Sequence, residues 1–495
     1  MLFLVSEYDN CRALLVYFIQ HLYPLNQEMS ESMPETIYDA VIIGVGQAGN
    51  PLAVALAKAG KRVALIEREA VGGTCINRGC TPTKTMIASA RVAYLARRAA
   101  DYGVHTGPVS VDLVKVRQRK RDIVEEFRSS TESKLEGSDK IDLIYGDAKF
   151  TGPYMVEIAP ADGSAAQTVT APLVFVNVGA RPAVPPIDGL DQIAFLDSTS
   201  IMELAAVPEH LLILGGSYIA LEFGQMFRRF GSQVTIVEQS ARILEREDAD
   251  VAEEMTKILT EDGIEIVTGA KAVKVAKTEN GGVALTLQTE TSEQTVAGSH
   301  FLVAAGRTPN TDALGLETAG IAKDTHGFIT VGDTLETSVP GVYALGDVKA
   351  GPAFTHISYD DYRIVESNLL QGGSRRVSDR LVPYTVFTDP QLGRVGITEA
   401  EAKKQGIPIK VAKIPMTQVA RAIETDETRG FMKAIVDAET KQILGAAVLG
   451  VEGGEIMSVL EVAMLGKLPY TALRDAVLAH PTLAEALNNL FLALE

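Results

Sequence analysis

The chain has 495 residues, and a typical domain size of ~150 residues divides this length into about three domains. Its formal net charge of -17 excludes nucleic acid and anionic membrane surfaces as the main partner, because both require a basic footprint. The three cysteines are too few for a disulfide framework and indicate a reducing compartment, so we expect a cytoplasmic protein.

The first part of the chain contains one long apolar stretch, LLVYFIQHLYPL at 14–25. It is shorter than the ~20 apolar residues that a membrane-spanning helix needs. Acidic residues also stand where a secretory signal carries positive charge. Met29 and Met33 lie just before the first strand pattern. We therefore expect residues 1–35 to be an N-terminal extension that is disordered or precedes the true start.

Two segments share one plan: an apolar strand, a glycine turn, a helix of small residues and a second strand that ends at a glutamate. The first begins YDAVIIGVGQAG and ends at Glu67, and the second begins HLLILGGSYIAL and ends at Glu238. Gly44 precedes Glu67 by 23 positions, and Gly215 precedes Glu238 by the same 23. Because each unit ends in an acid that can bind a ribose, the pattern predicts two dinucleotide sites.

The first glycine turn follows the dinucleotide-binding pattern at each of its glycines. Gly44, Gly46 and Gly49 come directly after the strand and open the helix. These positions permit a tight turn, close approach of the backbone to a pyrophosphate and close packing of helix on strand. Together with Glu67, they favour a dinucleotide site over a turn that is merely rich in glycine.

The second glycine turn departs from the pattern. Ser217 replaces the second glycine and Ala220 the third. The serine Cβ crowds a pyrophosphate, although its hydroxyl is able to donate a hydrogen bond to a phosphate oxygen. Glu238 accepts hydrogen bonds from a free ribose and repels a 2'-phosphate, which favours NADH over NADPH. Arg242 and Arg246 lie near enough in sequence to leave NADPH open.

Three further patterns continue the chain. Two short apolar strands stop at a glycine with an arginine close behind it, at Gly179 and Gly306, and resemble crossings between domains. The strand GVYALGDV ends at Asp347, which is a plausible ligand contact at a carboxyl end. From about residue 381, alternating strands followed by helices predict a third domain of α+β type.

The stretch GGTCINRGCTPTK contains Cys75 and Cys80, in a chain that has one other cysteine. The TPT that follows predicts a helix start with Pro82 at the first helical position. Cys80 then lies at the positive end of a helix dipole, which lowers the pKa of a thiol. A zinc site needs four ligands, and the chain offers no second cysteine pair or histidine cluster. The pattern therefore favours a redox-active disulfide and no resident metal.

This stretch closely resembles the active-site signature of the FAD-dependent pyridine nucleotide-disulfide oxidoreductases, which include glutathione reductase, dihydrolipoamide dehydrogenase and mercuric reductase. The likeness covers nearly all of residues 38–495. It implies an α/β fold with two Rossmann-like dinucleotide-binding domains, for FAD and NAD(P), and a C-terminal α+β dimerisation domain. The implied boundaries are 36–180 with 305–375 for FAD, 181–304 for NAD(P) and 380–495 for dimerisation.

The resemblance also implies roles for individual residues. Cys75 is expected to be the outer thiol that meets substrate, and Cys80 the inner thiolate against the flavin. Lys84 is expected to pair with Glu222 beside the flavin N5, and Asp347 to contact the ribityl chain. The implied cofactor-binding residues for FAD and for NADH or NADPH are Gly44, Gly46, Gly49, Glu67, Gly73, Thr74, Gly179, Gly215, Ser217, Glu238, Gly306 and Asp347.

Near the end of the chain, AHPTLAEAL contains His480 and Glu485. They match the family's His-Glu dyad, which acts as acid and base for the outer thiol across a homodimer and so shares the active site between chains. A thiolate leaving group needs a proton near pH 7, and histidine has a suitable pKa. The alternative is a neutral histidine buried under the helix.

Two branches of the family make a thiophilic metal ion the electron acceptor: the mercuric reductases and the flavoproteins of reactive-chlorine resistance, which reduce Cu(II). FTDPQLGRVGITEAEA resembles the first branch and FTHISYDDYRIV the second. The chain ends FLALE, without the vicinal cysteines typical of mercuric reductases. His480 and Glu485 leave dihydrolipoamide dehydrogenase as the alternative, and a non-enzymatic flavin redox sensor is a second alternative.

Overall fold

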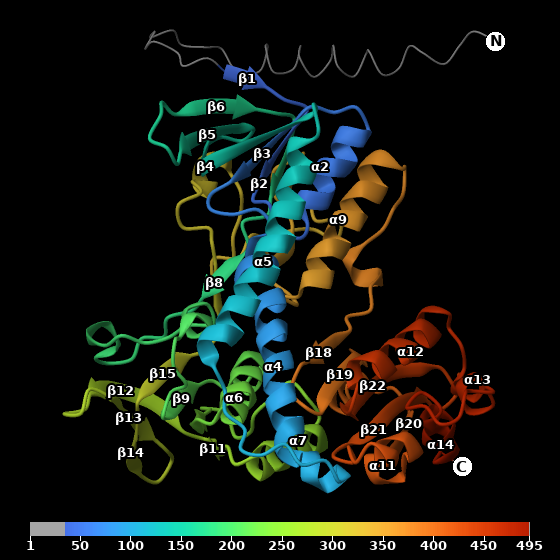
Figure 1. The fold of residues 1–495 in the computed structure, drawn as a ribbon. Coiled ribbons are helices and arrows are strands. Elements are labelled where there is room, and N and C mark those ends of the chain that lie inside the picture. Colours follow the sequence, from blue (N-terminus) through green and yellow to red (C-terminus); the bar gives the residue numbers. More distant parts are fainter. Residues whose placement is uncertain (1–34, 495) are drawn as a thin grey trace.

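The computed structural model describes residues 35–494, so the apolar stretch at 14–25 and nearly all of the expected extension lie outside the described residues. Three sheet-based units make up the described chain, and α4 (Cys80–Arg98) and α5 (Leu113–Glu136) run between the first unit and the other two (Figure 1). No helix among these residues is long and apolar enough to cross a membrane.

The first unit is built on an eight-stranded sheet of order β1-β6-β5-β4-β3-β2-β7-β17. Strands β4, β3, β2, β7 and β17 are parallel, whereas β4, β5 and β6 form an antiparallel ribbon. The strands are β1 (Glu35–Ile37), β2 (Ala40–Ile43), β3 (Val63–Glu67), β4 (Ile141–Gly152), β5 (Met155–Pro160), β6 (Gln167–Thr170), β7 (Leu173–Val176) and β17 (Val342–Ala344). Every residue of β2 is buried, because α2 packs on one face of the strand and residues of β5 and β6 pack on the other.

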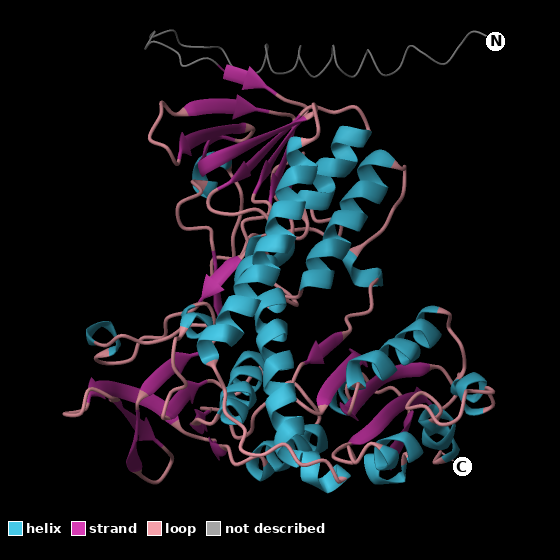
Figure 2. Cartoon of the chain, in the orientation of Figure 1, coloured by secondary structure: helices cyan, strands magenta, loops and turns pink. Residues whose placement is uncertain are grey.

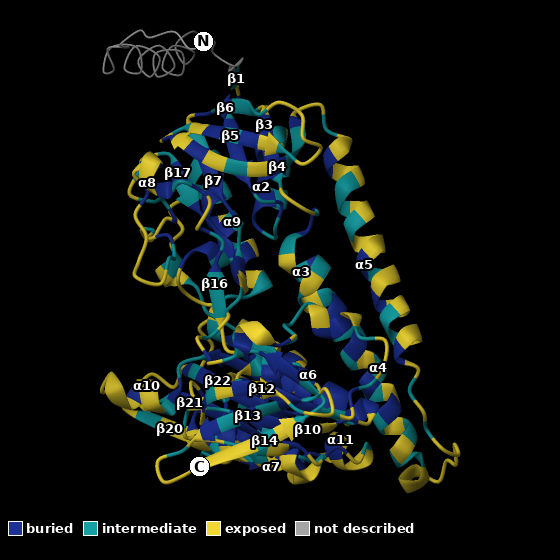
Figure 3. Cartoon of the chain, turned by 90° about the vertical axis from the view of Figure 1, so that its left-hand side faces the viewer, coloured by how far each residue is buried: buried dark blue, intermediate teal, exposed yellow. Residues whose placement is uncertain are grey.

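Helices α2 (Gly49–Lys58) and α9 (Thr355–Leu370) lie together against this sheet (Figure 2). Helix α3 (Gly73–Arg78) leads into α4, and α8 (Leu316–Ala319) packs on β4. Much of the surface of α5 is exposed, while the central strands are buried (Figure 3). The carboxyl ends of the parallel strands face the region between the units, where α3 and α4 begin.

The second unit contains a parallel four-stranded sheet of order β11-β10-β9-β15. Its elements are β9 (His210–Leu214), α6 (Tyr218–Phe230), β10 (Gln233–Val237), α7 (Ala249–Glu261), β11 (Glu265–Val267) and β15 (His300–Val303). An antiparallel sheet of β12 (Lys271–Lys277), β13 (Val283–Gln288) and β14 (Glu293–Gly298) extends it. The chain enters and leaves beside β8 (Ala180–Pro182) and β16 (Arg307–Pro309), which pair antiparallel.

The third unit is an antiparallel sheet of order β18-β19-β22-β21-β20 with helices packed on it. Its strands are β18 (Tyr384–Val386), β19 (Gln391–Gly396), β20 (Ile409–Pro415), β21 (Phe431–Asp437) and β22 (Ile443–Gly450). Its helices are α10 (Glu399–Lys404), α11 (Ala420–Glu424), α12 (Gly453–Leu465), α13 (Tyr470–Arg474) and α14 (Ala486–Leu492).

One hydrophobic cluster joins the three units. It contains Met86 of α4, Phe227 of α6 and Leu392 of β19, each 2% exposed or less. Helix α4, which begins at Cys80, and α6, which follows the second glycine turn, therefore share one hydrophobic core. The predicted fold class is confirmed, and the domain boundaries given above stay a prediction.

Candidate active site

A cavity of about 1480 Å³ lies at the carboxyl ends of the first sheet and continues between the units. It exceeds the ~300–1,000 Å³ of common ligand pockets, which fits a ligand as long as a flavin dinucleotide. The predicted site residues that line it are Gly44, Gly46, Glu67, Gly73, Thr74, Cys75, Cys80, Lys84, Gly179, Glu222 and Asp347. The predicted residues outside its lining are Gly49, Gly215, Ser217, Glu238, Gly306, His480 and Glu485.

The first glycine turn leaves no room for side chains. Gly44 has φ +99°, and a Cβ there would lie 2.4 Å from the carbonyl oxygen of Asn177. A Cβ on Gly49 would lie 2.2 Å from the Gly44 carbonyl oxygen. The Gly49 N–H donates to Asn177 Oδ1 at 2.9 Å, and Asn177 Nδ2 donates to the Leu345 carbonyl at 2.9 Å. Asn177 thus holds the turn beside two strand ends, a role that its place in VNVGAR did not indicate.

Glu67 closes onto the first turn from the end of β3. Its carboxylate accepts hydrogen bonds from the backbone N–H of Val45 and of Glu69, both at 2.9 Å. Burial raises the pKa of Glu67, and hydrogen bonds from backbone N–H groups, that of Val45 first among them, oppose the rise. The carboxylate lies at the rim of the cavity, where the fold places an acid against a ribose.

The second turn repeats this arrangement. Glu238 accepts from the N–H of Gly216 at 2.5 Å and from the N–H of Ser240 at 2.7 Å. Gly215 has φ +115°, and a Cβ there would lie 2.5 Å from the Ala304 carbonyl oxygen. Ser217 is the N-cap of α6, and its hydroxyl makes no capping hydrogen bond. The hydroxyl is therefore available for a ligand at the helix N-terminus.

The cysteines lie on two consecutive helices. Cys75 is within α3, and α4 begins at Cys80 itself, with Gly79 as the N-cap. The prediction that Pro82 occupies the first helical position is therefore wrong, since Pro82 is the third residue of α4. Proline is tolerated there because the first-turn N–H groups have no partner within the helix. Cys80 still lies at the positive end of the helix dipole.

The two thiols differ in acidity. The pKa of Cys80 is lowered to about 6, first by a hydrogen bond from the Cys75 thiol, then by the Thr355 hydroxyl and the Lys84 ammonium. The pKa of Cys75 is raised by its hydrogen bond to Cys80 and by burial. Thr355 Oγ1 lies 3.2 Å from Cys80 Sγ, so its hydroxyl is placed to donate to the thiolate. Cys80 is therefore the thiolate of the pair.

Lys84, one turn after Cys80, donates from Nζ to Glu222 Oε2 at 2.7 Å. Glu222 is 3% exposed, and its other oxygen accepts from the Phe387 N–H at 2.9 Å. Lys84 Nζ also lies 4.7 Å from the centroid of the Phe387 ring. The structure thus contains the Lys84–Glu222 pair that the family resemblance implies, and Phe387 adds a contact that the sequence did not reveal.

An aromatic wall lines the cavity near the cysteines. The Phe354 ring stacks on those of His356 and Tyr384, each at a centroid distance of 5.4 Å, and lies 5.9 Å from Tyr218. His356 Nε2 donates to the Pro383 carbonyl at 2.6 Å. Burial lowers the pKa of His356, so its imidazole is neutral near pH 7. The sequence patterns did not predict that these aromatic side chains stack on one another.

His480 and Glu485 form a pair away from the cavity of their own chain. His480 Nδ1 lies 2.9 Å from Glu485 Oε2, and the imidazole is 67% exposed. The alternative of a buried histidine is therefore wrong. An exposed imidazole whose Nδ1 is held by a carboxylate presents Nε2 outward, which is the geometry of an acid-base group.

Comparison with known proteins agrees with this site. A family model described as pyridine nucleotide-disulphide oxidoreductase matches residues 38–361, and that of its dimerisation domain matches 382–491. The probable pyridine nucleotide-disulfide oxidoreductase RclA of Escherichia coli is 41% identical over 458 residues, covering 92% of this chain and 98% of RclA. Its solved Cu(II) complex has a TM-score of 0.84 at 39% identity, covering 93% and 100%.

Two other enzymes of related activity are also similar. The mercuric reductase of Staphylococcus aureus is 34% identical over 452 residues, covering 91% of this chain and 81% of the reductase. The dihydrolipoyl dehydrogenase of Geobacillus stearothermophilus is 33% identical over 448 residues, covering 90% and 94%.

Two glycine turns, a dithiol and a dinucleotide-sized cavity define a flavoprotein disulfide reductase, an enzyme that uses FAD and NAD(P)H. The chain belongs to the pyridine nucleotide-disulfide oxidoreductase family. The glycines that a Cβ would obstruct and the two closing glutamates fit both dinucleotides.

Proposed function

We propose that this enzyme reduces a thiophilic metal ion, with Cu(II) or Hg(II) as acceptor, at the Cys75/Cys80 dithiol. The observation that carries the proposal is the Cys80 thiolate, with a pKa of about 6, beside Cys75 in the cavity. Thiolates are soft ligands that select soft metal ions. The likeness to RclA, which has been solved as a Cu(II) complex, supports the same acceptor class.

The two cysteines have different roles, with Cys80 on the flavin side of the dithiol and Cys75 on the side of the acceptor. The first glycine turn and Glu67 would hold FAD, whose chemistry when bound would be to pass a hydride equivalent, an electron pair and a proton, from the nicotinamide to the Cys75–Cys80 disulfide. Cys80 then remains a thiolate, held by the Thr355 hydroxyl and the positive charge of Lys84. Cys75 takes up the proton and meets the acceptor. Oxidation of the dithiol back to the disulfide supplies one electron pair, which reduces either one Hg(II) to Hg(0) or two Cu(II) to two Cu(I), and it releases the Cys75 proton.

The first turn is proposed to hold the FAD pyrophosphate at the N-terminus of α2, with Glu67 at the ribose. The second turn is proposed to hold NADH, because Glu238 repels a 2'-phosphate. Arg242 donates from Nη2 to the carbonyls of Glu245 and Glu247, at 3.1 and 3.2 Å, so its guanidinium is engaged by its own loop. This contact supports NADH over NADPH.

His480 and Glu485 are proposed to serve the site of a second copy of the chain. The imidazole is exposed and outside the cavity of its own chain, and the family's dimerisation domain covers 382–491. In a homodimer, His480 of the partner subunit would exchange a proton with Cys75. This dyad favours the second candidate function, dihydrolipoamide dehydrogenase, because a dithiol substrate needs an acid and base whereas a metal ion does not.

An acceptor panel with both nicotinamides tests the proposal. The purified enzyme with FAD is mixed anaerobically with NADH or NADPH and with Cu(II), Hg(II), lipoamide or glutathione disulfide. We expect sustained nicotinamide oxidation with at least one metal ion, and a higher kcat/KM for NADH than for NADPH. Turnover with lipoamide alone would establish the second candidate, and oxidation of a single equivalent with every acceptor would contradict both.

A further inference from the structure

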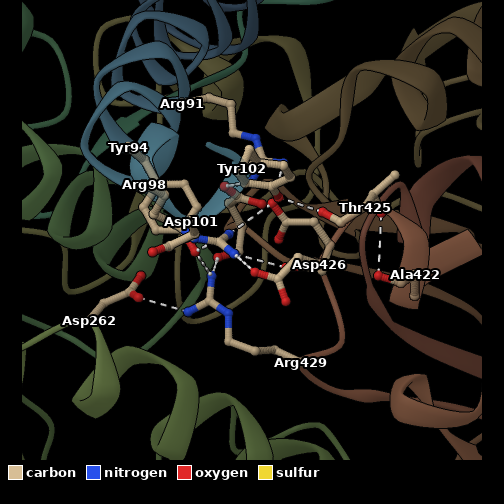
Figure 4. A network of polar contacts seen from close by, with 12 residues as sticks. Arg91, Tyr94, Arg98, Asp101, Tyr102, Asp262, Ala422, Thr425, Asp426 and Arg429 are labelled. Carbon is tan, nitrogen blue, oxygen red and sulfur yellow. Dashed lines mark hydrogen bonds and ion pairs between the residues drawn. The ribbon is translucent and has the colours of Figure 1, made fainter. Parts of the chain in front are cut away.

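Four arginines surround one tyrosine where the three units meet. Figure 4 labels three of them, Arg91, Arg98 and Arg429, together with Tyr94. The guanidinium carbons of Arg229, Arg98, Arg91 and Arg429 lie 3.8, 5.1, 5.5 and 5.6 Å from the centroid of the Tyr94 ring. We call these five residues the Tyr94 cluster. Guanidinium groups stack well on aromatic faces, but four positive charges this close require compensating carboxylates.

The carboxylates come from the second and third units. Glu427 accepts from Arg91 at 2.8 Å and Arg98 at 3.2 Å. Asp262 accepts from Arg429 at 2.7 Å. Asp389 pairs with both Arg91 and Arg229. Because Arg229 is 6% exposed and Asp389 15% exposed, their pairing is shielded from solvent and holds its partners firmly.

Asp389 is held by its backbone as well as by its side chain. Gln225 of α6 accepts from the Asp389 N–H at 2.7 Å and donates to the Asp389 carbonyl at 2.9 Å. Arg429 and Arg229 donate to the same carbonyl at 3.0 and 3.2 Å. The convergence of these donors fixes the chain at Asp389 against α4 and α6.

Phe387, two residues before Asp389, connects this segment to the active site. The N–H of Phe387 donates to Glu222 Oε1 at 2.9 Å, and Glu222 pairs with Lys84. Along α6, Gln225 follows Glu222 by one turn. Along α4, Arg91 follows Lys84 by seven residues, so it lies on the same helix face. The short segment 387–389 is therefore attached to both helices, at the active site by Phe387 and at the cluster by Asp389.

We propose that the three arginines of the Tyr94 cluster that bind Asp389, which are Arg91, Arg229 and Arg429, form a positioning device. Through Asp389, they hold the backbone of Phe387 against Glu222 and so fix the Lys84–Glu222 pair beside Cys80. None of the cluster residues lines the cavity, so they act through other residues and not on substrate. The inference concerns the enzyme's own thiol and rests on the proposed role of Cys80 as the thiolate.

The direction of the effect follows from the charges around Cys80. Lys84 lowers the pKa of Cys80, and Glu222 raises it. If Phe387 no longer donates to Glu222, the Glu222 carboxylate is stabilised by Lys84 alone and binds its ammonium group more tightly. The ammonium group then stabilises the Cys80 thiolate less. Loosening the segment is therefore expected to make Cys80 harder to ionise.

The test measures the ionisation of Cys80 directly. The measurements use a Cys75→Ser background with FAD bound. The thiolate-to-flavin absorbance and the rate of Cys80 alkylation by iodoacetamide are each measured as a function of pH. Each curve gives a midpoint, the pH at which half of Cys80 is ionised. Asp389→Asn removes the paired charge at nearly constant shape. We expect it to raise both midpoints by about 0.5 to 1 pH unit. Gln225→Met, which removes the backbone clamp but keeps all four arginines, is expected to shift them in the same direction.

Arg98→Met is the matched control. Arg98 binds Tyr94, Asp426 and Glu427 and makes no contact with Asp389 or Gln225 among the described interactions. It should lower thermal stability as Asp389→Asn does and leave both midpoints in place. Unchanged midpoints in folded Asp389→Asn or Gln225→Met would overturn the proposal, as would an equal shift in Arg98→Met.

The test also separates this proposal from the assignment of Cys80. If the Cys75→Ser parent shows no thiolate-to-flavin absorbance, the assignment of Cys80 as inner thiolate is wrong. The alkylation midpoints still measure the ionisation of Cys80 in that event. An upward shift in Asp389→Asn and Gln225→Met, without a shift in Arg98→Met, then still supports the positioning role.

Discussion

At the scale of single residues, the two cysteines have different chemistry because their neighbours differ. Cys80 begins a helix and receives hydrogen bonds from Cys75 and Thr355. Cys75 lies inside the short helix α3, where its thiol donates and burial penalises its charge. The sequence predicted this division from the helix start and the family signature, but Thr355 is 275 residues away from Cys80 and was not predictable.

Replacing one cysteine at a time should separate their roles. Cys80→Ser is expected to abolish the thiolate-to-flavin absorbance on two-electron reduction, because the thiolate itself is removed. Cys75→Ser is expected to keep that absorbance and to stop reduction of the acceptor. Visible spectra during anaerobic titration with NADH provide the measurement. Identical behaviour of the two variants would show that inner and outer thiols are wrongly assigned.

The Cys80 thiolate should also have a defined pH dependence. With a pKa of about 6, the thiolate is present above that pH and is lost as the pH falls through it. Thr355→Val removes one hydroxyl donor to the thiolate, so the midpoint should rise by roughly 1 pH unit. The measurement is a pH titration of the thiolate-to-flavin absorbance in the Cys75→Ser background. A midpoint that Thr355→Val leaves unchanged would exclude the hydroxyl as a donor.

At the scale of elements, each glycine turn is closed by a glutamate at the end of the next strand. The carboxylates of Glu67 and Glu238 bind corresponding backbone N–H groups, those of Val45 and Gly216. This repeated geometry explains why both turns keep the same distance of 23 positions from glycine to glutamate. The two glutamates therefore hold in place the turns at which we propose that α2 and α6 bind phosphate.

Adding a single methyl group to Gly44 should test whether the first turn binds FAD. In Gly44→Ala, the new Cβ would lie 2.4 Å from the Asn177 carbonyl oxygen, at a φ of +99° that alanine rarely adopts. We expect the protein to be purified with less than about a tenth of the FAD of the parent. Gly60→Ala is the control, since Gly60 also has a positive φ but has open space around it. FAD content similar to that of the parent in Gly44→Ala would contradict the assignment of this turn.

The sequence predicted the elements whose residues have a clear local pattern. The strand-turn-helix units, the strands after residue 381 and the strand before Asp347 were predictable from hydrophobic periodicity and glycine positions. The antiparallel ribbon of β4, β5 and β6 and the helix α3 were not predicted. The contacts of Asn177, Phe387 and Asp389 were also missed, because each depends on residues that are distant in sequence and meet only in the fold.

At the scale of the whole molecule, the shared hydrophobic cluster and the Tyr94 cluster join the three units around the cavity. His480 is the exception, because it is exposed and away from the cysteines of its own chain. The proposed sharing of sites in a homodimer would account for this placement, and the match to the family's dimerisation domain at 382–491 supports a homodimer.

Mixing inactive subunits tests whether the sites are shared. Cys75→Ser and His480→Ala homodimers are each expected to have little activity with a disulfide substrate. If each site needs Cys75 of one chain and His480 of the other, mixed dimers regain one complete site. Reassembly of an equal mixture should restore about a quarter of the parent activity. No recovery, despite mixed dimers detected by native mass spectrometry, would show that the sites are not shared.

The most direct test of the central claim compares metal-dependent turnover in the parent enzyme and in Cys75→Ser. Both are assayed for NADH oxidation with Cu(II) and with Hg(II). The assay is anaerobic because oxygen would otherwise react with the reduced flavin. We expect sustained turnover in the parent and its loss in Cys75→Ser, which keeps FAD and Cys80. Equal turnover in the two proteins would show that the metal ion is reduced without the dithiol and would contradict the proposed role of Cys75.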